Sequence, residues 1–434
     1  MSPTAIPGNL ILQSPTANDP LLDLNTQPSL DLQFATSKTL NDRVSGQNLI
    51  TFSRSTTGTY VDSNGIIQTA AIDAPRFDHD PTTGESLGLL IEESRTNLVT
   101  YSEDFNDIAW TKRNITFTSN VATAPDGSTT ADKIAPNSGS VYPADIRDTL
   151  TITTPITLSI WAKADGFNVI NLNLSNYGDS DVEDAFLKVN VNTGTLVESS
   201  GSAGGFWTSY SITPYPNGWY RITATTTDVT DGGATVLFQV CEDDGSQTIT
   251  TGDGTKGILI WGAQLEAGAF PTSYIPTSGS TVPRAADVAS ITGSNFSRWY
   301  NQGEGTFIAT HEETSTRNVI GAVYGGGAQL RLFSYLNTTR VQFLYGSGTG
   351  YFGYSSSPSS PPAYVKTAFY YDGLSYGGTI QGLTPSNLTT TTAPSPSLFE
   401  IGRANNVYTF NGRIPRLTYY PYRLSDATLQ EITS

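Results

Sequence analysis

The sequence predicts an all-β protein in which two antiparallel jelly-roll β-sandwiches stand in tandem after an extended N-terminal anchoring segment. Composition is the first observation: 41 Gly and 24 Pro accompany a charged fraction of only 14%, which suits short strands joined by turns. Turn signals such as Asp165-Gly166 and Asn217-Gly218 are the second. The third is the alternation of Val236, Phe238 and Val240, which is the period of a half-buried strand.

Residues 1–98 are predicted to form an N-terminal segment that serves attachment and oligomerisation. Five prolines and no sustained period mark its first third, so we expect that part to run extended over a partner surface. Short strands should follow. The sequence Asp62-Ser63-Asn64-Gly65 predicts the turn of a hairpin, because Asn and Gly tolerate a positive φ.

Residues 99–280 are predicted to form the first sandwich. The apolar run Ile258 to Trp261 and the alternating Tyr220, Ile222 and Ala224 are typical of its strands. Five of the six tryptophans lie in this range. We assign three of them to the core because they stand in apolar strands: Trp161, Trp219 and Trp261.

Residues 281–434 are predicted to form the second sandwich. Gly305 to Ala309 should be an early strand, and residues 346–362 should be a long surface loop rich in Gly, Ser, Tyr and Pro. The final residues, Leu424 to Ile432, predict one short helix with Ser425 as its N-cap.

Charge and apolar patterning exclude several partners. The formal net charge of −16 disfavours nucleic acid, whose binding requires Lys and Arg at the phosphates. No apolar run approaches the length of a membrane span and no signal peptide is visible, so we expect no membrane insertion. Cys241 is the single cysteine, which excludes a disulfide within the chain.

The sequence offers no recognisable catalytic set, and we expect no enzymatic activity. Its two histidines are His79 and His311, and the residues after His311 do not continue as a zinc-protease motif. The second sandwich also lacks the alternating acidic residues that lectin-like glucanases carry on one strand. This departure disfavours hydrolysis of a glycan.

Several segments resemble parts of bacteriophage tail-fibre and other virion appendage proteins. Residues 53–99 resemble a recurrent N-terminal segment of phage structural proteins. The pieces SEDFNDIAWTK, LSIWAKA, NGWYRITAT and IWGAQLEAG together resemble a carbohydrate-binding-module-like jelly roll. Residues 410–433, FNGRIPRLTYYPYRLSDATLQEIT, resemble the end of laminin-G or concanavalin A-like sandwiches.

The resemblance implies a phage virion protein made in the host cytoplasm, and it suggests a tail fibre that binds host-surface glycan without hydrolysing it. It implies a homotrimer whose N-terminal segment contacts other virion proteins. A head fibre or capsid-decorating protein is the alternative, and a glycan depolymerase is less favoured.

Aromatic side chains in loops are the candidate glycan contacts, because exposed rings stack on sugars. Loop-like surroundings single out Tyr177, Trp207, Tyr210, Tyr351 and Tyr354. Packing within a trimer and ordinary loop aromatics are equally good explanations of these residues.

No cofactor is required by the sequence, but a structural Ca²⁺ has candidate ligands. The densest acidic cluster contains Asp179, Asp181, Glu183 and Asp184, whose alternate oxygens could bind a hard cation. It lacks the Gly and the distal Glu of an EF-hand loop, and a solvated acidic loop is the favoured interpretation. Calcium is common in carbohydrate-module-like sandwiches, so the resemblance makes Glu103, Asp104 and Glu266 alternative ligands.

The joint between the two sandwiches, residues 258–309, carries polar and aromatic residues in an otherwise plain linker. We expect Gln264, Glu266, Tyr274 and Arg284 to fix the two sandwiches in a set relation.

Overall fold

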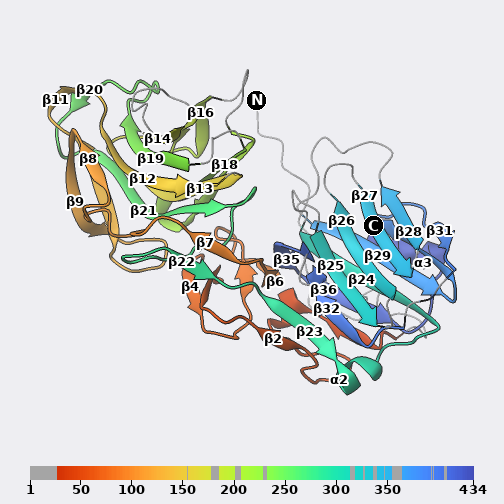
Figure 1. Ribbon diagram of the computed structural model, residues 1–434. Helices are drawn as coiled ribbons and strands as arrows, with labels where there is room; N and C mark the ends of the chain where they lie inside the picture. The colour runs from red at the N-terminus through yellow and green to blue at the C-terminus, as the bar shows by residue number, and fades with distance from the viewer. Residues whose placement is uncertain are drawn as a thin grey trace. The chain divides into compact units, whose positions relative to one another are not determined.

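The computed structural model is all-β, and its described residues include three short α-helices (Figure 1). It describes residues 27–153, 155–176, 185–200, 207–227, 232–312, 318–325, 328–335, 340–346, 348–353, 364–391, 393, 395–404 and 408–434. The chain divides into two compact units. The central unit comprises residues 53–85 and 92–287, and the terminal unit comprises residues 1–52, 86–91 and 288–434.

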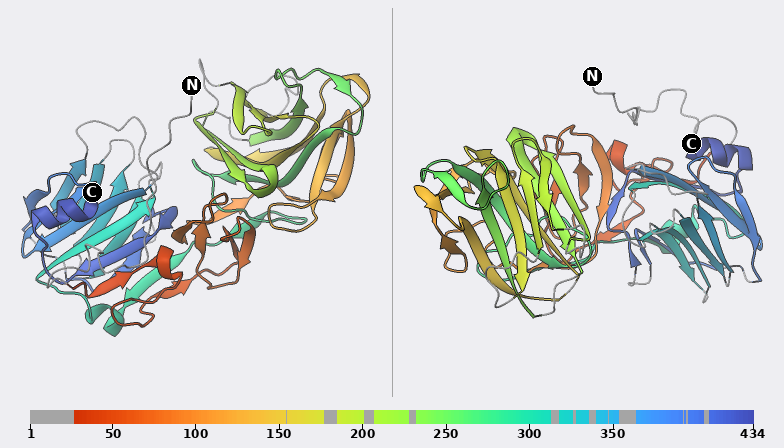
Figure 2. Two further views of the ribbon diagram at one scale, coloured as in Figure 1. Left: turned by 180° about the vertical axis from the view of Figure 1, so that it is seen from behind. Right: turned by 90° about the horizontal axis from the view of Figure 1, so that it is seen from above.

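The central unit is a sandwich of two six-stranded antiparallel sheets (Figure 2). One sheet has the order β17 (Ser209–Tyr215), β18 (Trp219–Thr226), β13 (Ile156–Asp165), β21 (Gly257–Ala267), β10 (Ala131–Pro136) and β9 (Ile115–Ala122). The other has the order β16 (Thr195–Ser199), β15 (Ala185–Asn190), β14 (Val169–Asn176), β19 (Gly232–Cys241), β12 (Asp145–Ile152) and β8 (Thr111–Arg113).

The core of the central unit lies between these sheets. Alternate residues of β19, among them Val236 and Phe238, are fully buried and meet Ile160 and Ile260 of the opposite sheet in one apolar cluster. The predicted alternation is therefore confirmed. The three core tryptophans are also confirmed, each 1% exposed: Trp161, Trp219 and Trp261.

Smaller two-stranded sheets complete the central unit. They pair β3 (Gly58–Val61) with β4 (Ile67–Ala70), β7 (Arg95–Asn97) with β22 (Val282–Arg284), and β11 (Gly139–Val141) with β20 (Ile249–Gly252). The unit also contains β5 (Phe77–His79) and a 3-10 turn, η1 (Pro216–Gly218). The predicted hairpin turn joins β3 to β4, and Gly65 adopts a φ of +76° in it.

The terminal unit is a second antiparallel sandwich. Its six-stranded sheet has the order β1 (Leu30–Leu32), β36 (Arg416–Tyr420), β24 (Glu304–Glu312), β29 (Tyr364–Asp372), β30 (Ser375–Ile380) and β31 (Ser386–Thr389). Its seven-stranded sheet has the order β2 (Thr51–Ser53), β23 (Val288–Thr292), β32 (Leu398–Ile401), β25 (Asn318–Gly325), β26 (Ala328–Tyr335), β27 (Arg340–Gly346) and β28 (Gly348–Gly353). Two short pairs join β33 (Arg403–Ala404) to β34 (Tyr408–Thr409), and β35 (Gly412–Ile414) to β6 (Ser86–Ile91).

Aromatic rings hold the two sheets of the terminal unit together. Phe307 of β24 and Phe399 of β32 have ring centroids 5.4 Å apart. Trp299 packs against both, at 6.2 Å and 5.9 Å. It follows the short helix α2 (Gly293–Ser297), which leads the chain from one sheet to the other.

The other helices of the terminal unit are α1 (Phe34–Ser37) and α3 (Asp426–Thr433). Ser425 caps α3 as predicted, since its Oγ accepts a hydrogen bond from the amide of Thr428 at 3.2 Å. Among the described residues, no helix combines the length and apolar character that crossing a membrane would require.

The structure divides the N-terminal 98 residues differently from the separate segment expected from the sequence. β1 is an edge strand of the terminal sandwich, with Leu30 opposite Tyr419 and Leu32 opposite Leu417. The buried carboxylate of Asp31 pairs there with Arg416 at 2.9 Å. Residues 53–85 and 92–98 instead belong to the central unit. Three-residue strands such as β1 depend on distant partners, which a local pattern cannot reveal.

Candidate binding site

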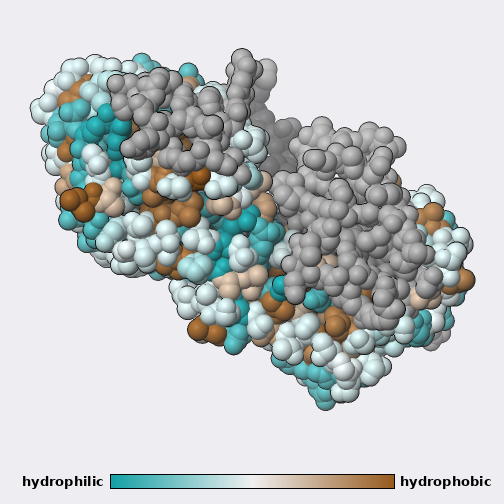
Figure 3. All heavy atoms as spheres, viewed as in Figure 1, coloured by the Kyte–Doolittle hydropathy of each residue, from teal (hydrophilic) through white to brown (hydrophobic). Residues whose placement is uncertain are grey.

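A polar pocket of about 550 Å³ opens on the central unit. Four chain segments form it: the loop after Ser102, the end of β9, the start of β10, and the segment that follows Tyr274. Its lining consists of Glu103, Asp104, Asn106, Ser119, Asn120, Thr130, Asp132, Pro276, Thr277 and Ser278. Carboxylate, amide and hydroxyl groups thus dominate the wall. Figure 3 shows one face of the molecule, on which the coloured apolar residues occur in small patches among polar ones.

Side-chain to backbone hydrogen bonds fix one wall of the pocket. The Ser102 amide donates to the Thr277 hydroxyl at 3.0 Å, and the Thr277 amide donates to the Ser102 hydroxyl at 2.8 Å. The Tyr274 hydroxyl donates to Glu103 at 2.8 Å. These bonds join the loop at 102–104 to the segment at 274–278, so the pocket is preorganised before any ligand arrives.

Asp132 fixes the opposite wall. It is 1% exposed, and its two oxygens accept hydrogen bonds from the amides of Asn120 at 2.8 Å and Phe105 at 3.2 Å. Asn120 has a φ of +55°, and the pairing of β10 with β9 shifts register between Ala131 and Lys133. This irregularity brings a carboxylate to the edge of an otherwise apolar strand.

Burial raises the pKa of two carboxyl groups of the pocket, Asp132 and Glu103. The pKa of Asp132 is raised to about 6. Desolvation is the largest cause and the charge of Asp104 acts in the same direction, while the two amide hydrogen bonds oppose them. Desolvation also raises the pKa of Glu103, and the nearby charge of Asp126 acts in the same direction. Perturbed carboxyl groups in a concavity are typical of a ligand site.

The predicted glycan contacts fall in different places. The exposure expected for Trp207 is wrong: it is 7% exposed and belongs to the apolar core of the central unit, where no sugar can reach its ring. Tyr210 is 47% exposed on the edge strand β17. The backbone of Tyr351 lies in β28, opposite Gln342, and its side chain lies outside the description, as do Tyr177 and Tyr354 altogether.

The predicted calcium ligands are only partly described. Asp179, Asp181, Glu183 and Asp184 lie outside the described residues. Of the alternative ligands, Glu103 and Asp104 line the pocket. Glu266 does not line it: this side chain is fully buried, and its oxygens accept from Thr272 at 2.7 Å and Gln264 at 2.9 Å. Within the described part of the chain, no three His, Cys, Asp or Glu residues are grouped so as to hold a metal ion.

Of the lining residues, the sequence analysis named only Glu103 and Asp104, and it missed Asp132 and Asn120 among the others. The only local signal is an Asp inside the apolar stretch Ala131–Pro136, where a buried charge is costly unless it serves a purpose. The segment at 276–278 carries no signal of its own, since contacts with residues 101 and 102, distant in the sequence, place it at the pocket.

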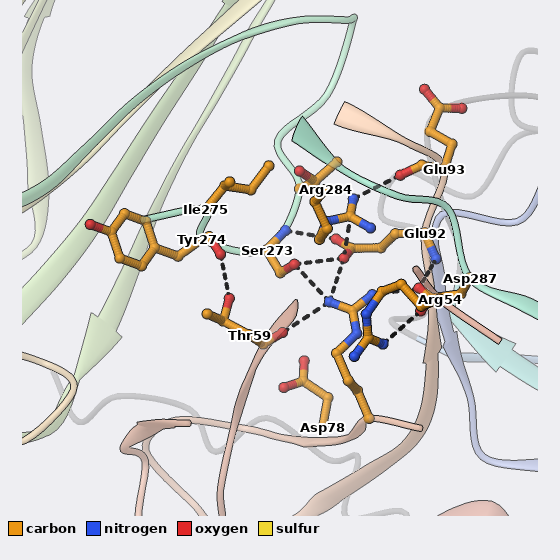
Figure 4. Close-up of polar contacts among 12 residues, drawn as sticks. Arg54, Thr59, Asp78, Glu92, Glu93, Ser273, Tyr274, Ile275, Arg284 and Asp287 are labelled. Atoms are coloured by element: carbon orange, nitrogen blue, oxygen red, sulfur yellow. Dashed lines mark hydrogen bonds and ion pairs between the residues drawn. The ribbon is translucent and has the colours of Figure 1, made fainter. Parts of the chain in front are cut away.

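A second polar cluster is buried in the central unit (Figure 4). Arg76 pairs with Asp287 at 2.5 Å and with Glu92 at 2.7 Å, and Arg54 pairs with Asp287 at 3.0 Å. Arg284 lies 3.5 Å from Glu92. All five side chains are at most 7% exposed. The cations hold the pKa of Glu92 well below its usual range despite burial, so Glu92 stays ionised.

The role expected for the residues of the joint, fixing the two sandwiches in a set relation, stays a prediction. Their described hydrogen bonds are made within the central unit: Arg284 donates to the Glu93 carbonyl at 2.8 Å, and Gln264 accepts from the Ile275 amide at 2.7 Å. Tyr274 accepts from Thr59 at 2.6 Å through its carbonyl. The joint therefore fastens residues 53–85 and 92–98 to the first sandwich.

Comparisons with known proteins give only distant likenesses. No family model matches the chain, and no curated protein matches it. Among solved structures, it is similar to the CBM40 module of a Ruminococcus gnavus IT-sialidase bound to α2,3-sialyllactose, with 18% identity and a TM-score of 0.27 over 31% of this chain and 84% of that one.

Two further likenesses are of the same kind. Trypanosoma rangeli sialidase in complex with sialic acid has 13% identity and a TM-score of 0.26 over 70% of this chain and 60% of that one. Domains LG4-5 of the mouse laminin α1 chain have 12% identity and a TM-score of 0.21 over 62% of this chain and 83% of that one. Such TM-scores carry no argument about a ligand, and the sandwich fold of this chain rests on its own sheets.

Proposed function

We propose that this chain binds a glycan in the polar pocket of its central unit, without cleaving it, as an appendage of a phage particle. The observation that carries glycan binding is the pocket, about 550 Å³ lined by carboxylate, amide and hydroxyl groups. These groups accept and donate hydrogen bonds as sugar hydroxyls require, and the wall is fixed in advance by its own bonds.

Cleavage is the second candidate function, because a carboxyl group with a pKa of about 6 can act as a general acid. We favour binding alone. Asp132 is 1% exposed and both its oxygens already accept backbone hydrogen bonds, so it holds the wall and is poorly presented to a leaving group.

A glycan array followed by calorimetry on the best ligand tests binding, with Asn106→Ala as the pocket variant, because that side chain lines the pocket and is exposed. We expect binding that the variant weakens. Asn41→Ala, at an exposed position of the terminal unit, serves as the matched control. Binding that is the same in all three proteins would place the ligand elsewhere. Release of new reducing ends from host polysaccharide would show that the protein is a depolymerase.

The place in a phage particle rests on the resemblance of residues 53–99 and 410–433 to virion proteins. We propose a tail fibre, with a head fibre or capsid-decorating protein as the alternative, and a homotrimer. Three copies of a weak site on one appendage would raise the effective affinity for a cell surface by about 10² to 10⁴.

The N-terminal segment is the proposed contact with other virion proteins, and the structure sharpens its test. Residues 30–32 and 51–53 supply strands of the terminal sandwich, so a deletion should stop before them. Removing residues 1–26 is expected to abolish incorporation into particles and to leave both units folded. Particles that still carry the truncated protein would refute attachment through these residues.

A further inference from the structure

The charge of the pocket narrows the class of glycan that it can bind. Glu103, Asp104 and Asp132 line it, and among the described residues the lining contains no Lys, Arg or His. Lys112 is the cation whose charge acts on Asp104 and Asp132, but its Nζ donates to backbone carbonyls, including that of Trp110 at 3.0 Å. Within the described pocket wall, no ion pair joins these carboxylates to a cation, and Lys112 acts on Asp132 only through the longer-range effect of its charge.

Neutral donors hold these carboxylates in place without cancelling their charge. Asp132 is bonded by two backbone amides and Glu103 by a tyrosine hydroxyl. A ligand with an anionic group would bring a fourth negative charge into the cavity. A ligand with an ammonium group would supply the missing positive charge together with three hydrogen-bond donors.

We propose that the pocket binds a sugar that carries a free ammonium group and discriminates against sialic and uronic acids. This inference rests on the proposed glycan binding at the same site. The Glu103 and Asp104 side chains on the loop wall would accept hydrogen bonds from the ammonium group, and the buried Asp132 on β10 would act on it through its charge. Acetylation of the amino group removes its positive charge and two of its three N–H donors.

Calorimetry with a glucosamine tetramer, its fully N-acetylated counterpart and sialyllactose tests the proposal, near neutral pH and with EDTA present. We expect the glucosamine tetramer to bind at least about tenfold more tightly than the acetylated one, the factor expected for one charge-assisted hydrogen bond. Sialyllactose should not compete. The chelator ensures that no divalent cation bridges the sugar to the carboxylates.

Two variants with the same change in net charge separate the pocket from the general attraction of an acidic protein for cations. In Asp104→Asn the remaining oxygen can still accept from the Asn106 amide, as Asp104 does at 3.1 Å, so the loop should keep its fold. We expect this variant to lose the preference for the glucosamine tetramer. Glu431→Gln on α3, whose side chain is exposed, should keep it.

The outcomes are distinct. Equal affinity for the amino and acetylated tetramers, or displacement of either by sialyllactose, would overturn the ammonium specificity and leave glycan binding intact. An equal loss in Asp104→Asn and Glu431→Gln would also overturn it, since the attraction would then be unspecific. If none of these sugars binds, and no sugar on a wider array does, both proposals fail.

Discussion

The guanidinium of Arg76 donates to the carboxylate of Asp287 at 2.5 Å, and both side chains are fully excluded from solvent. The two residues are 211 positions apart in the sequence. Asp287 also accepts from Arg54 and from the Glu92 amide, at 3.0 Å and 2.9 Å. One buried carboxylate thus joins the segment before the central sandwich to the segment after it.

Substituting Asp287 with Ala should therefore destabilise the central unit strongly. Two arginines would keep their charges in the interior without their common partner, and breaking a buried pair in this way costs about 3 to 5 kcal/mol. Urea denaturation followed by tryptophan fluorescence measures the change. Asp165→Ala is the control, because its carboxylate is 45% exposed where it pairs with Lys133 and should contribute at most about 1 kcal/mol. Equal effects of the two substitutions would contradict a structural role of the buried cluster.

The buried cluster also marks the limit of what the sequence could predict. Alternation at Val236, Phe238 and Val240 and the turn at 62–65 are local signals, and the structure confirms both. The pairing of Arg76 with Asp287 has no local signal. Short strands such as β1 likewise depend on partners hundreds of residues away, so the division of residues 1–98 between two units was not foreseeable from their own pattern.

The candidate site was predictable only in part for a related reason. Glu103 and Asp104 were weighed as ligands on the basis of a resemblance, and both line the pocket. Asp132 joins them because of a register shift in β10, which a sequence does not display. Trp207 follows two glycines in a loop-like stretch, yet it turns into the core, where the burial of a large apolar ring is favourable.

Asp132 should make the stability of the central unit depend on pH. An unfolded aspartate has a pKa of about 3.9, whereas burial raises that of Asp132 to about 6 in the folded protein. Between these pH values the folded protein binds a proton that the unfolded chain has released. The contribution of this group to the unfolding free energy therefore falls as the pH rises through that window.

The comparison with Asp132→Asn isolates this contribution, because Asp145 and Asp148 also have pKa values raised to about 6 by burial and remain in both proteins. We expect the stability of the wild-type protein relative to the variant to decrease from about pH 4 to about pH 6. Urea denaturation across that range measures it. A difference that does not change with pH would show that Asp132 titrates normally.

Alanine substitutions of Trp207 and Tyr210 compare a buried aromatic side chain of the central unit with an exposed one. Trp207→Ala should cost about 3 to 5 kcal/mol of unfolding free energy, because it empties a site in the core. Tyr210→Ala should cost less than about 1 kcal/mol, since nearly half of that side chain is exposed on an edge strand. Thermal denaturation of both variants measures the difference. Comparable losses would mean that the edge strand is covered, as in a trimer.

Removing residues 1–52 should unfold the terminal unit while the central unit stays folded. The deletion removes β1 and β2 from the two sheets of the terminal sandwich, together with Leu30 and Leu32, which are at most 1% exposed. It also leaves Arg416 without Asp31. Because Trp299 is the tryptophan of the terminal unit, its replacement by Phe in a parallel variant assigns the fluorescence change.

The deletion of residues 1–26 is the control, since it spares both strands. We expect that protein to unfold as the full chain does, and the 1–52 deletion to lose the Trp299 signal and become sensitive to protease within residues 288–434. A protease-resistant terminal unit in the longer deletion would show that the unit folds without β1 and β2. We expect the terminal unit to unfold because Leu30 and Leu32 of β1 are buried in it. An edge strand that contributes buried leucines belongs to the folding unit, however far its residues lie from the rest of that unit in the sequence.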